Sequence, residues 1–141
     1  METNRKTHQY ILITGAVLIL IGIVLGAFGA HGLKEKLTFE QLNSFEVGVR
    51  YQIYHGLALL IIGFNVSKIN FSPSLFYKLI LIGVILFSGS IYFFACKYLI
   101  GVFPPKIAYL ITPLGGVLLI SAWFFLVFKL IVDGKQIKLK K

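Results

Sequence analysis

Three histidines are the residues of this chain best suited to chemistry at neutral pH, because a histidine can bind a metal ion or transfer a proton. His31 and His55 stand at the two edges of the longest polar stretch between apolar segments, and His8 precedes the first such segment. No carboxylate lies at the spacing that a zinc site with these histidines would need. No serine adjoins a histidine, and the apolar segments hold no Asp or Glu for a proton relay. We therefore expect no catalytic residue, no metal site and no cofactor.

Further polar residues lie within or beside the apolar segments, where a polar group is costly and usually has a partner. We predict that they meet in one cluster. It could be a hydrogen-bonded plug that fixes helix packing, a pocket for a lipid headgroup or a partner's segment, or a catalytic or ion-conducting site, and we favour the plug. The candidate cluster comprises His31, Glu46, Arg50, Tyr51, Gln52, His55, Ser88, Ser90, Tyr92 and Thr112.

The composition is that of an integral membrane protein. Of 141 residues, 57% are hydrophobic and 13% are charged, which fits neither an ordinary soluble domain nor a disordered chain. A helix needs about 20 apolar residues to cross the hydrocarbon core of a bilayer. We therefore predict a single all-α domain over residues 1–141, an integral membrane four-helix bundle. Its spans lie at about 10–30, 50–66, 75–99 and 107–131.

The first span is longer than the roughly 7–15 apolar residues of a signal-peptide core, so we expect it to remain uncleaved. The net charge of +9 arises from 14 Lys and Arg against 5 Asp and Glu. We assign these basic residues to lipid headgroups beside the spans, because no separate basic domain remains to bind nucleic acid. Membrane lipids, and no nucleic acid, are therefore the expected partners.

The second span is short, and the segment before it supplies the missing length. Thr38 is followed three residues later by Gln41, which is the capping-box pattern that begins a helix. Apolar residues then recur at steps of three and four along the segment. We predict one long helix from Phe39 to about Asn65, whose first part, residues 39–50, is an amphipathic extension of the second span.

Small residues recur at helical spacing in the first and fourth spans. They let two helix backbones approach closely, where dispersion is the main attraction in lipid. We expect packing within the chain rather than between two copies, because three other helices are available for it. The predicted packing positions are Gly22, Gly26, Gly29, Ala30, Gly115 and Gly116.

Basic residues are more numerous on one side of the predicted membrane. With four spans, nine Lys and Arg flank the side that holds both termini, and five flank the other side. Basic residues concentrate on the cytoplasmic side, so we predict that both termini are cytoplasmic. The candidate cluster then lies in the outer half of the bundle, and the cytoplasmic half is nearly pure Leu, Ile, Phe and Val.

Four segments, taken in order, resemble a known family. They are Gly26–Leu33 (GAFGAHGL), Tyr51–Leu60 (YQIYHGLALL), Phe87–Tyr92 (FSGSIY) and Thr112–Gly116 (TPLGG). In these segments the chain is similar to the small membrane proteins called domain of unknown function 423, which are related to the eukaryotic transmembrane protein 256. The resemblance implies an uncleaved four-helix membrane protein and brings no activity, substrate or cofactor. It marks as motif positions His31, Tyr51, Gln52, His55, Ser88, Ser90, Tyr92, Thr112 and Pro113.

For function, we favour a non-enzymatic accessory or scaffold subunit that packs against a larger membrane assembly in a bacterial plasma membrane. The absence of catalytic groups, the glycine-rich first span and the amphipathic segment support this hypothesis. The alternative is a binding or transport protein for a lipid or small amphiphile, with the polar cluster as its site. An enzyme is the least favoured hypothesis.

Overall fold

The computed structural model describes the backbone of residues 2–139 and the side chains of residues 8–133. Four long helices make up most of that range. They are α1 (Glu2–Phe28), α2 (Phe39–Phe64), α3 (Ser74–Cys96) and α4 (Ile111–Leu139). No strand occurs between residues 2 and 139, and four helical regions are long and apolar enough to cross a membrane. The predicted all-α membrane fold is confirmed.

Short helical turns extend or connect the long helices. A π-helical turn, η1 (Gly29–Leu33), continues α1, and 3-10 turns η2 (Val66–Lys68) and η3 (Lys106–Leu110) follow α2 and precede α4. After α3 the chain turns at Gly101, whose positive φ of 65° suits a residue without a Cβ. Pro104 and Pro105 come next in the connection, and a residue that precedes a proline is disfavoured in a helix. The fourth span therefore begins after them, at Lys106.

The predicted capping box begins α2. The Thr38 side chain accepts a hydrogen bond from the Gln41 amide at 3.3 Å, and the Gln41 side chain accepts one from the Thr38 amide at 2.9 Å. These two bonds satisfy amides that have no partner in the first turn of a helix. The helix then runs unbroken to Phe64, which confirms the prediction of one long helix that includes the amphipathic extension.

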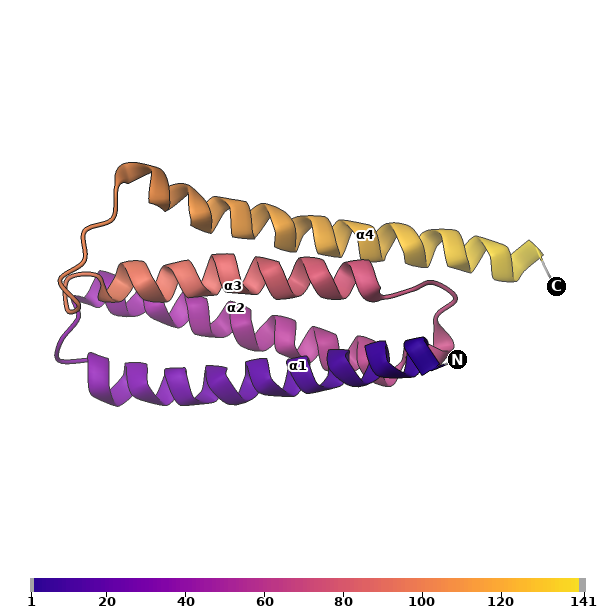
Figure 1. Ribbon diagram of the computed structural model, residues 1–141, viewed down its shortest axis with the longest axis horizontal. Coiled ribbons are helices and arrows are strands. Elements are labelled where there is room, and N and C mark those ends of the chain that lie inside the picture. Colours follow the sequence, from indigo (N-terminus) through magenta and orange to yellow (C-terminus); the bar gives the residue numbers. More distant parts are fainter. Residues whose placement is uncertain (1, 140–141) are drawn as a thin grey trace.

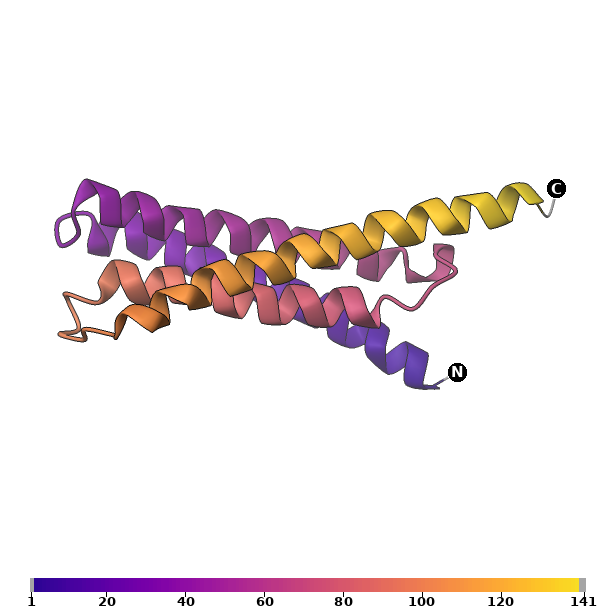
Figure 2. The ribbon, with the colours of Figure 1, turned by 90° about the horizontal axis from the view of Figure 1, so that it is seen from above.

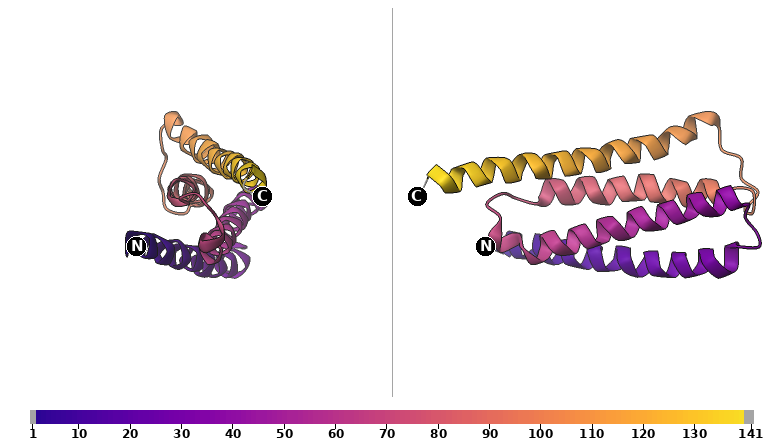
Figure 3. Two further views of the ribbon diagram at one scale, coloured as in Figure 1. Left: turned by 90° about the vertical axis from the view of Figure 1, so that its right-hand side faces the viewer. Right: turned by 180° about the vertical axis from the view of Figure 1, so that it is seen from behind.

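The helices run up and down in sequence order (Figure 1). Residues 2 and 139 and the α2–α3 connection lie at one end, called here the terminal end, and the other two connections lie at the distal end. α1 packs mainly against α2, and α4 packs mainly against α3, which it crosses at an angle (Figure 2). The two pairs meet through α2 and α3, so the helices seen end-on form a bent row with α1 and α4 far apart (Figure 3).

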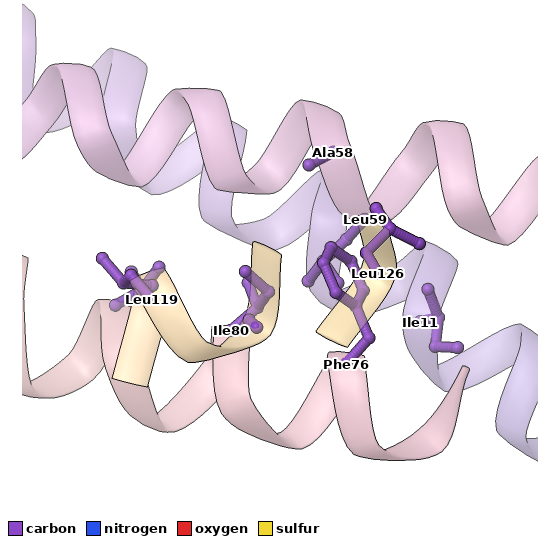
Figure 4. Close-up of a cluster of buried hydrophobic side chains, with 9 residues drawn as sticks. Ile11, Ala58, Leu59, Phe76, Ile80, Leu119 and Leu126 are labelled. Atoms are coloured by element: carbon purple, nitrogen blue, oxygen red, sulfur yellow. The ribbon is translucent and has the colours of Figure 1, made fainter. Parts of the chain in front are cut away.

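Two clusters of buried hydrophobic side chains hold the row together. The larger cluster draws on all four helices and lies toward the terminal end, where Leu59, Phe76 and Leu126 meet from three of them (Figure 4). The smaller cluster, around Phe45 and Val49, lies toward the distal end. Along α2 and α3, the buried polar side chains fall between these two clusters.

Glycines let α1 and α2 meet backbone to backbone. A Cβ added to Gly15 would lie 2.8 Å from the carbonyl oxygen of Gly56, and a Cβ added to Gly56 would lie 3.0 Å from the carbonyl oxygen of Gly15. Gly22, Gly26 and Gly29 continue this seam against the larger α2 side chains Ile53, Val49 and Phe45. Ala30 is exposed, so the row of small residues expected to pack ends at Gly29.

Candidate functional site

Gln52 is a buried side chain in the middle of α2 that joins three helices. Its Nε2 donates a hydrogen bond to the backbone carbonyl of Leu18 on α1 at 2.8 Å. Its Oε1 accepts a hydrogen bond from the Tyr92 hydroxyl on α3 at 3.0 Å. In lipid, such bonds replace contacts that water would otherwise provide, so Gln52 sets the relative position of α1, α2 and α3.

His55, one turn further along α2, joins it to α4. Its Nε2 lies 3.1 Å from Trp123 Nε1, and its Nδ1 lies 2.7 Å from the carbonyl oxygen of Tyr51. An indole N–H can only donate, so Nε2 accepts, and Nδ1 carries the proton that it donates to the Tyr51 carbonyl. The imidazole is therefore neutral with both nitrogens engaged, which leaves neither free for a metal ion or for acid–base catalysis.

A serine–threonine pair joins α3 to α4 nearer the distal end. Ser90 Oγ donates to the carbonyl of Phe87 at 3.0 Å and lies 2.6 Å from Thr112 Oγ1. Since the Ser90 proton is used by Phe87, the Thr112 hydroxyl is the donor between them. Ser88, two residues earlier on α3, is fully buried, and its hydroxyl has no hydrogen-bond partner among the described residues.

Three residues of the predicted cluster lie elsewhere. His31 is exposed in η1, and no group of His, Cys, Asp and Glu among the described residues could hold a metal ion. Glu46 and Arg50 face each other 4.0 Å apart with about half of each side chain exposed, a pair that contributes little free energy. At 100° per residue along a helix, both lie on faces of α2 turned away from Gln52. The prediction that these three residues join the cluster is therefore corrected.

The buried polar residues also lie deeper than the sequence predicts. Leu18, the partner of Gln52, is near the middle of its span His8–Leu33, and Trp123 is nearer to Asp133 than to Lys106 in the fourth span. The prediction placed Gln52 and His55 in the outer half because it took the second span as residues 50–66, whereas the apolar helix in the structure spans Phe39–Phe64 and holds both near its middle. Gln52 and His55 therefore lie near the middle of the bundle, while the Ser90–Thr112 pair lies nearer the distal end.

The terminal half of the bundle is not purely apolar either. Thr14 Oγ1 on α1 and the Tyr77 hydroxyl on α3 lie 3.1 Å apart, so a hydrogen bond joins these two helices. Neither residue belongs to the predicted cluster, because a lone Thr and a Tyr in an apolar span carry no pairing signal. Trp123 did carry a signal, since an indole N–H within an apolar span needs an acceptor.

A lateral groove opens beside the His55–Trp123 bond. It has a volume of about 580 Å³ and lies between α2, α3 and α4. Its lining is almost entirely apolar and aromatic, and the hydrogen-bonded histidine and tryptophan form part of its wall. The lining residues are Tyr51, His55, Phe87, Gly116, Leu119, Ile120, Trp123, Phe124 and Val127.

The two adjacent glycines of α4 have different surroundings. A Cβ on Gly115 would overlap the backbone nitrogen of Phe87, so this glycine provides the close contact between α3 and α4. A Cβ on Gly116 would lie 3.7 Å from the Phe87 ring, which is an ordinary contact. Gly116 instead lines the groove, whose space it leaves open.

Comparison with known proteins agrees with the resemblance noted in the sequence. The family model described as "Protein of unknown function (DUF423)" matches residues 25–116. A UPF0382 membrane protein of Staphylococcus epidermidis is 39% identical over 116 residues, covering 82% of this chain and 90% of the relative. The UPF0382 membrane protein YwdK of Bacillus subtilis is 38% identical over 118 residues, covering 82% and 91%. No solved structure matches the chain. The chain belongs to the DUF423 family and is a multi-pass membrane protein.

Proposed function

We propose that this protein is a non-enzymatic protein of a bacterial plasma membrane that binds the hydrocarbon part of a lipid or other amphiphile in the groove between α2, α3 and α4. The observation that carries the proposal is the groove itself. It is a concave, apolar and aromatic surface of about 580 Å³ within the membrane-spanning part of the chain, where hydrocarbon is the solvent.

The volume of the groove favours a hydrocarbon chain over a partner helix. Small-molecule sites span roughly 300–1,000 Å³, and a cavity of about 150 Å³ accommodates one benzene molecule. A helix with side chains is about 10–12 Å across, so about one turn of it would fill this volume. A flexible chain can follow the groove along α4 from Gly116 to Val127, about 16 Å at 1.5 Å per residue.

The state of His55 supports a role without catalysis. It is the titratable group that lines the groove together with Tyr51, and both of its ring nitrogens already hold hydrogen bonds within the chain. A neutral imidazole engaged in this way acts as a fixed part of the wall. The groove then supplies shape and apolar contact, which suit binding.

The excess of basic residues at the terminal end supports placing that end in the cytoplasm. Lys68 and Lys78 lie near the α2–α3 connection, and Lys129 lies in the last part of the fourth span. The remaining basic residues of this group lie outside the range whose side chains are described. They are Arg5, Lys6, Lys135, Lys138, Lys140 and Lys141.

Trp123 provides a direct test, because it is the one tryptophan of the chain and it lines the groove. The protein is reconstituted in phosphatidylcholine vesicles that contain a few mole per cent of a dibrominated stearyl alcohol, whose bromines quench tryptophan at contact. Binding in the groove predicts quenching that saturates with probe concentration and is reversed by unbrominated stearyl alcohol.

Two glycine variants form a matched pair for this test. Gly116→Leu fills the groove without a steric clash at Cβ, and it should remove most of the saturable quenching. Gly89→Leu makes the same change on α3 at a site with no atom within 4 Å, and it should leave the quenching unchanged. Quenching that rises linearly with the probe, equally in both variants, would contradict binding in the groove.

A second candidate function is the accessory subunit favoured by the sequence. The open row of helices supports it, because α1 and α4 each pack chiefly against one neighbour and leave broad apolar faces uncovered within the chain. The protein would then co-purify with a stoichiometric membrane partner from native membranes in mild detergent, at native expression. Recovery of the free protein alone would count against this role.

A further inference from the structure

A second hollow, called here the polar pocket, lies between α2 and α3 near the distal end. Its volume is about 300 Å³. One wall is polar and comes from the first turns of α2, whereas the other wall is apolar and comes from the last turns of α3. The lining residues are Glu40, Gln41, Ser44, Ile91, Phe94 and Ala95.

The polar pocket and the groove lie on the same side of the α2–α3 pair. On α2, the lining residues Glu40, Ser44, Tyr51 and His55 follow one another at steps of four, seven and four, which keeps them on one helix face. On α3, the lining residues Phe87, Ile91 and Phe94 follow at steps of four and three. The Tyr51 and Phe87 rings, 4.8 Å apart, stand at the end of the groove nearest the pocket.

The distance between the two hollows matches the distance between the headgroup and the hydrocarbon chain of an amphiphile. Glu40 and His55 are 55 − 40 = 15 residues apart on one helix, which is about 22 Å along its axis. α2 has 26 residues and is therefore about 39 Å long, longer than the hydrocarbon core of about 30 Å. Glu40, in its first turn, then lies at the boundary of the membrane with water, while His55 lies within it.

Aromatic side chains mark the same boundary on α3. Phe94, in the wall of the polar pocket, stacks on Tyr109 with ring centroids 4.5 Å apart. Lys97 donates a hydrogen bond to the Tyr109 hydroxyl at 2.6 Å and lies over the Tyr98 ring. A tyrosine–lysine arrangement of this kind is typical of the headgroup region. The polar pocket is thus level with lipid headgroups.

The charge of the polar pocket selects the headgroup. Glu40 supplies a carboxylate that forms no ion pair with any described residue, and the Ser44 hydroxyl likewise has no hydrogen-bond partner among them. Gln41 is occupied by the capping box, and the nearby cation Lys97 is held by Tyr109. A primary ammonium offers three donors and a positive charge to these acceptors, whereas a carboxylate headgroup offers them no donor.

We propose that the polar pocket binds the primary ammonium headgroup of an amphiphile whose hydrocarbon chain lies in the groove. This inference rests on the proposed function, since it adds a headgroup site to the chain site. Glu40 accepts the charge-assisted hydrogen bond, Ser44 accepts a second, and the chain passes the Tyr51–Phe87 pair into the apolar part of the groove.

The test compares two probes that share one chain. Dibrominated stearylamine and dibrominated stearyl alcohol are titrated separately into phosphatidylcholine vesicles that contain the full chain, at pH 7, with Trp123 fluorescence as the readout. We expect the amine to reach half-maximal quenching at a mole fraction about fivefold lower than the alcohol, as one charge-assisted hydrogen bond would provide. Glu40→Gln should remove this preference, so that both probes reach half-maximal quenching at about the same mole fraction.

Glu46→Gln is the matched control. It removes the same charge from the same helix, on a face that lines neither hollow, and should keep the fivefold preference. Saturable and equal quenching by both probes in the wild-type chain would overturn the headgroup site and leave the chain site standing. Tighter quenching by dibrominated stearic acid than by the amine would overturn it as well. Absence of saturation with the alcohol would instead overturn the proposed function.

Discussion

The two sides of α2 pack in opposite ways. Toward α1, Gly15 and Gly56 bring the two backbones into contact, and side chains fill the rest of the seam. Toward α4, contact depends on the hydrogen bond between His55 and Trp123, and a groove of about 580 Å³ lies beside it. One helix thus carries both a closed interface and an open one.

The difference shows that a glycine in a membrane helix can have either of two roles. Gly56 and Gly115 are packed against backbone atoms, so they allow helices to approach. Gly116 lies next to Gly115, yet its missing side chain contributes empty space to the groove. Since lipid provides no hydrophobic attraction between helices, the closed interfaces hold the fold together by packing, whereas the open one leaves the groove unfilled within the described chain.

The largest expected loss of stability comes from inserting a side chain into the closely packed α1–α2 seam. Gly56→Leu would place its Cβ 2.9 Å from Ile19 and 3.0 Å from the Gly15 carbonyl oxygen, and neither α1 nor α2 can yield without losing contacts. We expect a loss of about 3 kcal/mol in the free energy of unfolding. Unfolding in mixed micelles, followed by circular dichroism, measures it.

The exposed Gly89→Leu serves as the control for helix propensity and should not lower stability. If Gly56→Leu unfolds within about 1 kcal/mol of this control, then the α1–α2 seam is looser than its glycine contacts indicate.

Gln52→Leu tests the polar part of the same seam. The change removes hydrogen bonds to Leu18 and Tyr92 and leaves the Tyr92 hydroxyl without its acceptor in lipid. We expect a loss of about 1–2 kcal/mol, the upper part of the range for hydrogen bonds between membrane helices. Tyr92→Phe removes one of the two bonds and should cost about half as much, measured in the same micelles. Equal stability of wild type and Gln52→Leu would show that the hydrogen bonds of Gln52 do not stabilise the packing of α1, α2 and α3.

The contact between α2 and α4 should be weaker. In a double-mutant cycle with His55→Leu and Trp123→Phe, we expect a coupling energy of about 0.6 kcal/mol, the average for hydrogen bonds in membrane proteins. The wild type, the two single variants and the double variant are unfolded by heat, and the unfolded fraction is followed by its shifted mobility on a gel. The four stabilities give the coupling energy. A coupling larger than the effect of Gln52→Leu would reverse the order of the two sides of α2.

The smallest effect should come from Ser88. Its buried hydroxyl has no partner among the described residues, so Ser88→Ala removes no hydrogen bond and should leave the free energy of unfolding nearly unchanged. Ser90→Ala, two residues along α3, removes the bond to Thr112 and should lower the free energy of unfolding by about 0.6 kcal/mol. Hydrogen exchange of the α3 amides compares the two variants. A lower stability for Ser88→Ala than for Ser90→Ala would indicate a bound partner at Ser88.

The local parts of this fold could be predicted from the sequence. The four spans follow from apolar length, and the start of α2 follows from Thr38 and Gln41, whose bonds involve residues three apart. The pairing of Gln52 with Leu18 could not be predicted, because its partner is a backbone carbonyl that every residue has. The different roles of Gly115 and Gly116 depend on the angle of α4 against α3, which no local pattern encodes.

The row order of the helices has a consequence for how the chain assembles as it is made. α1 packs chiefly against α2, and α3 packs chiefly against α4, so the α1–α2 pair can form before α3 enters the membrane. At that stage Gln52 already holds Leu18 through its Nε2, but its Oε1 has no partner until Tyr92 arrives. An unpaired amide oxygen in hydrocarbon makes the early pair incomplete, and the arrival of α3 completes it. Gln52 thereby couples the docking of the second half of the chain to the stability of the first.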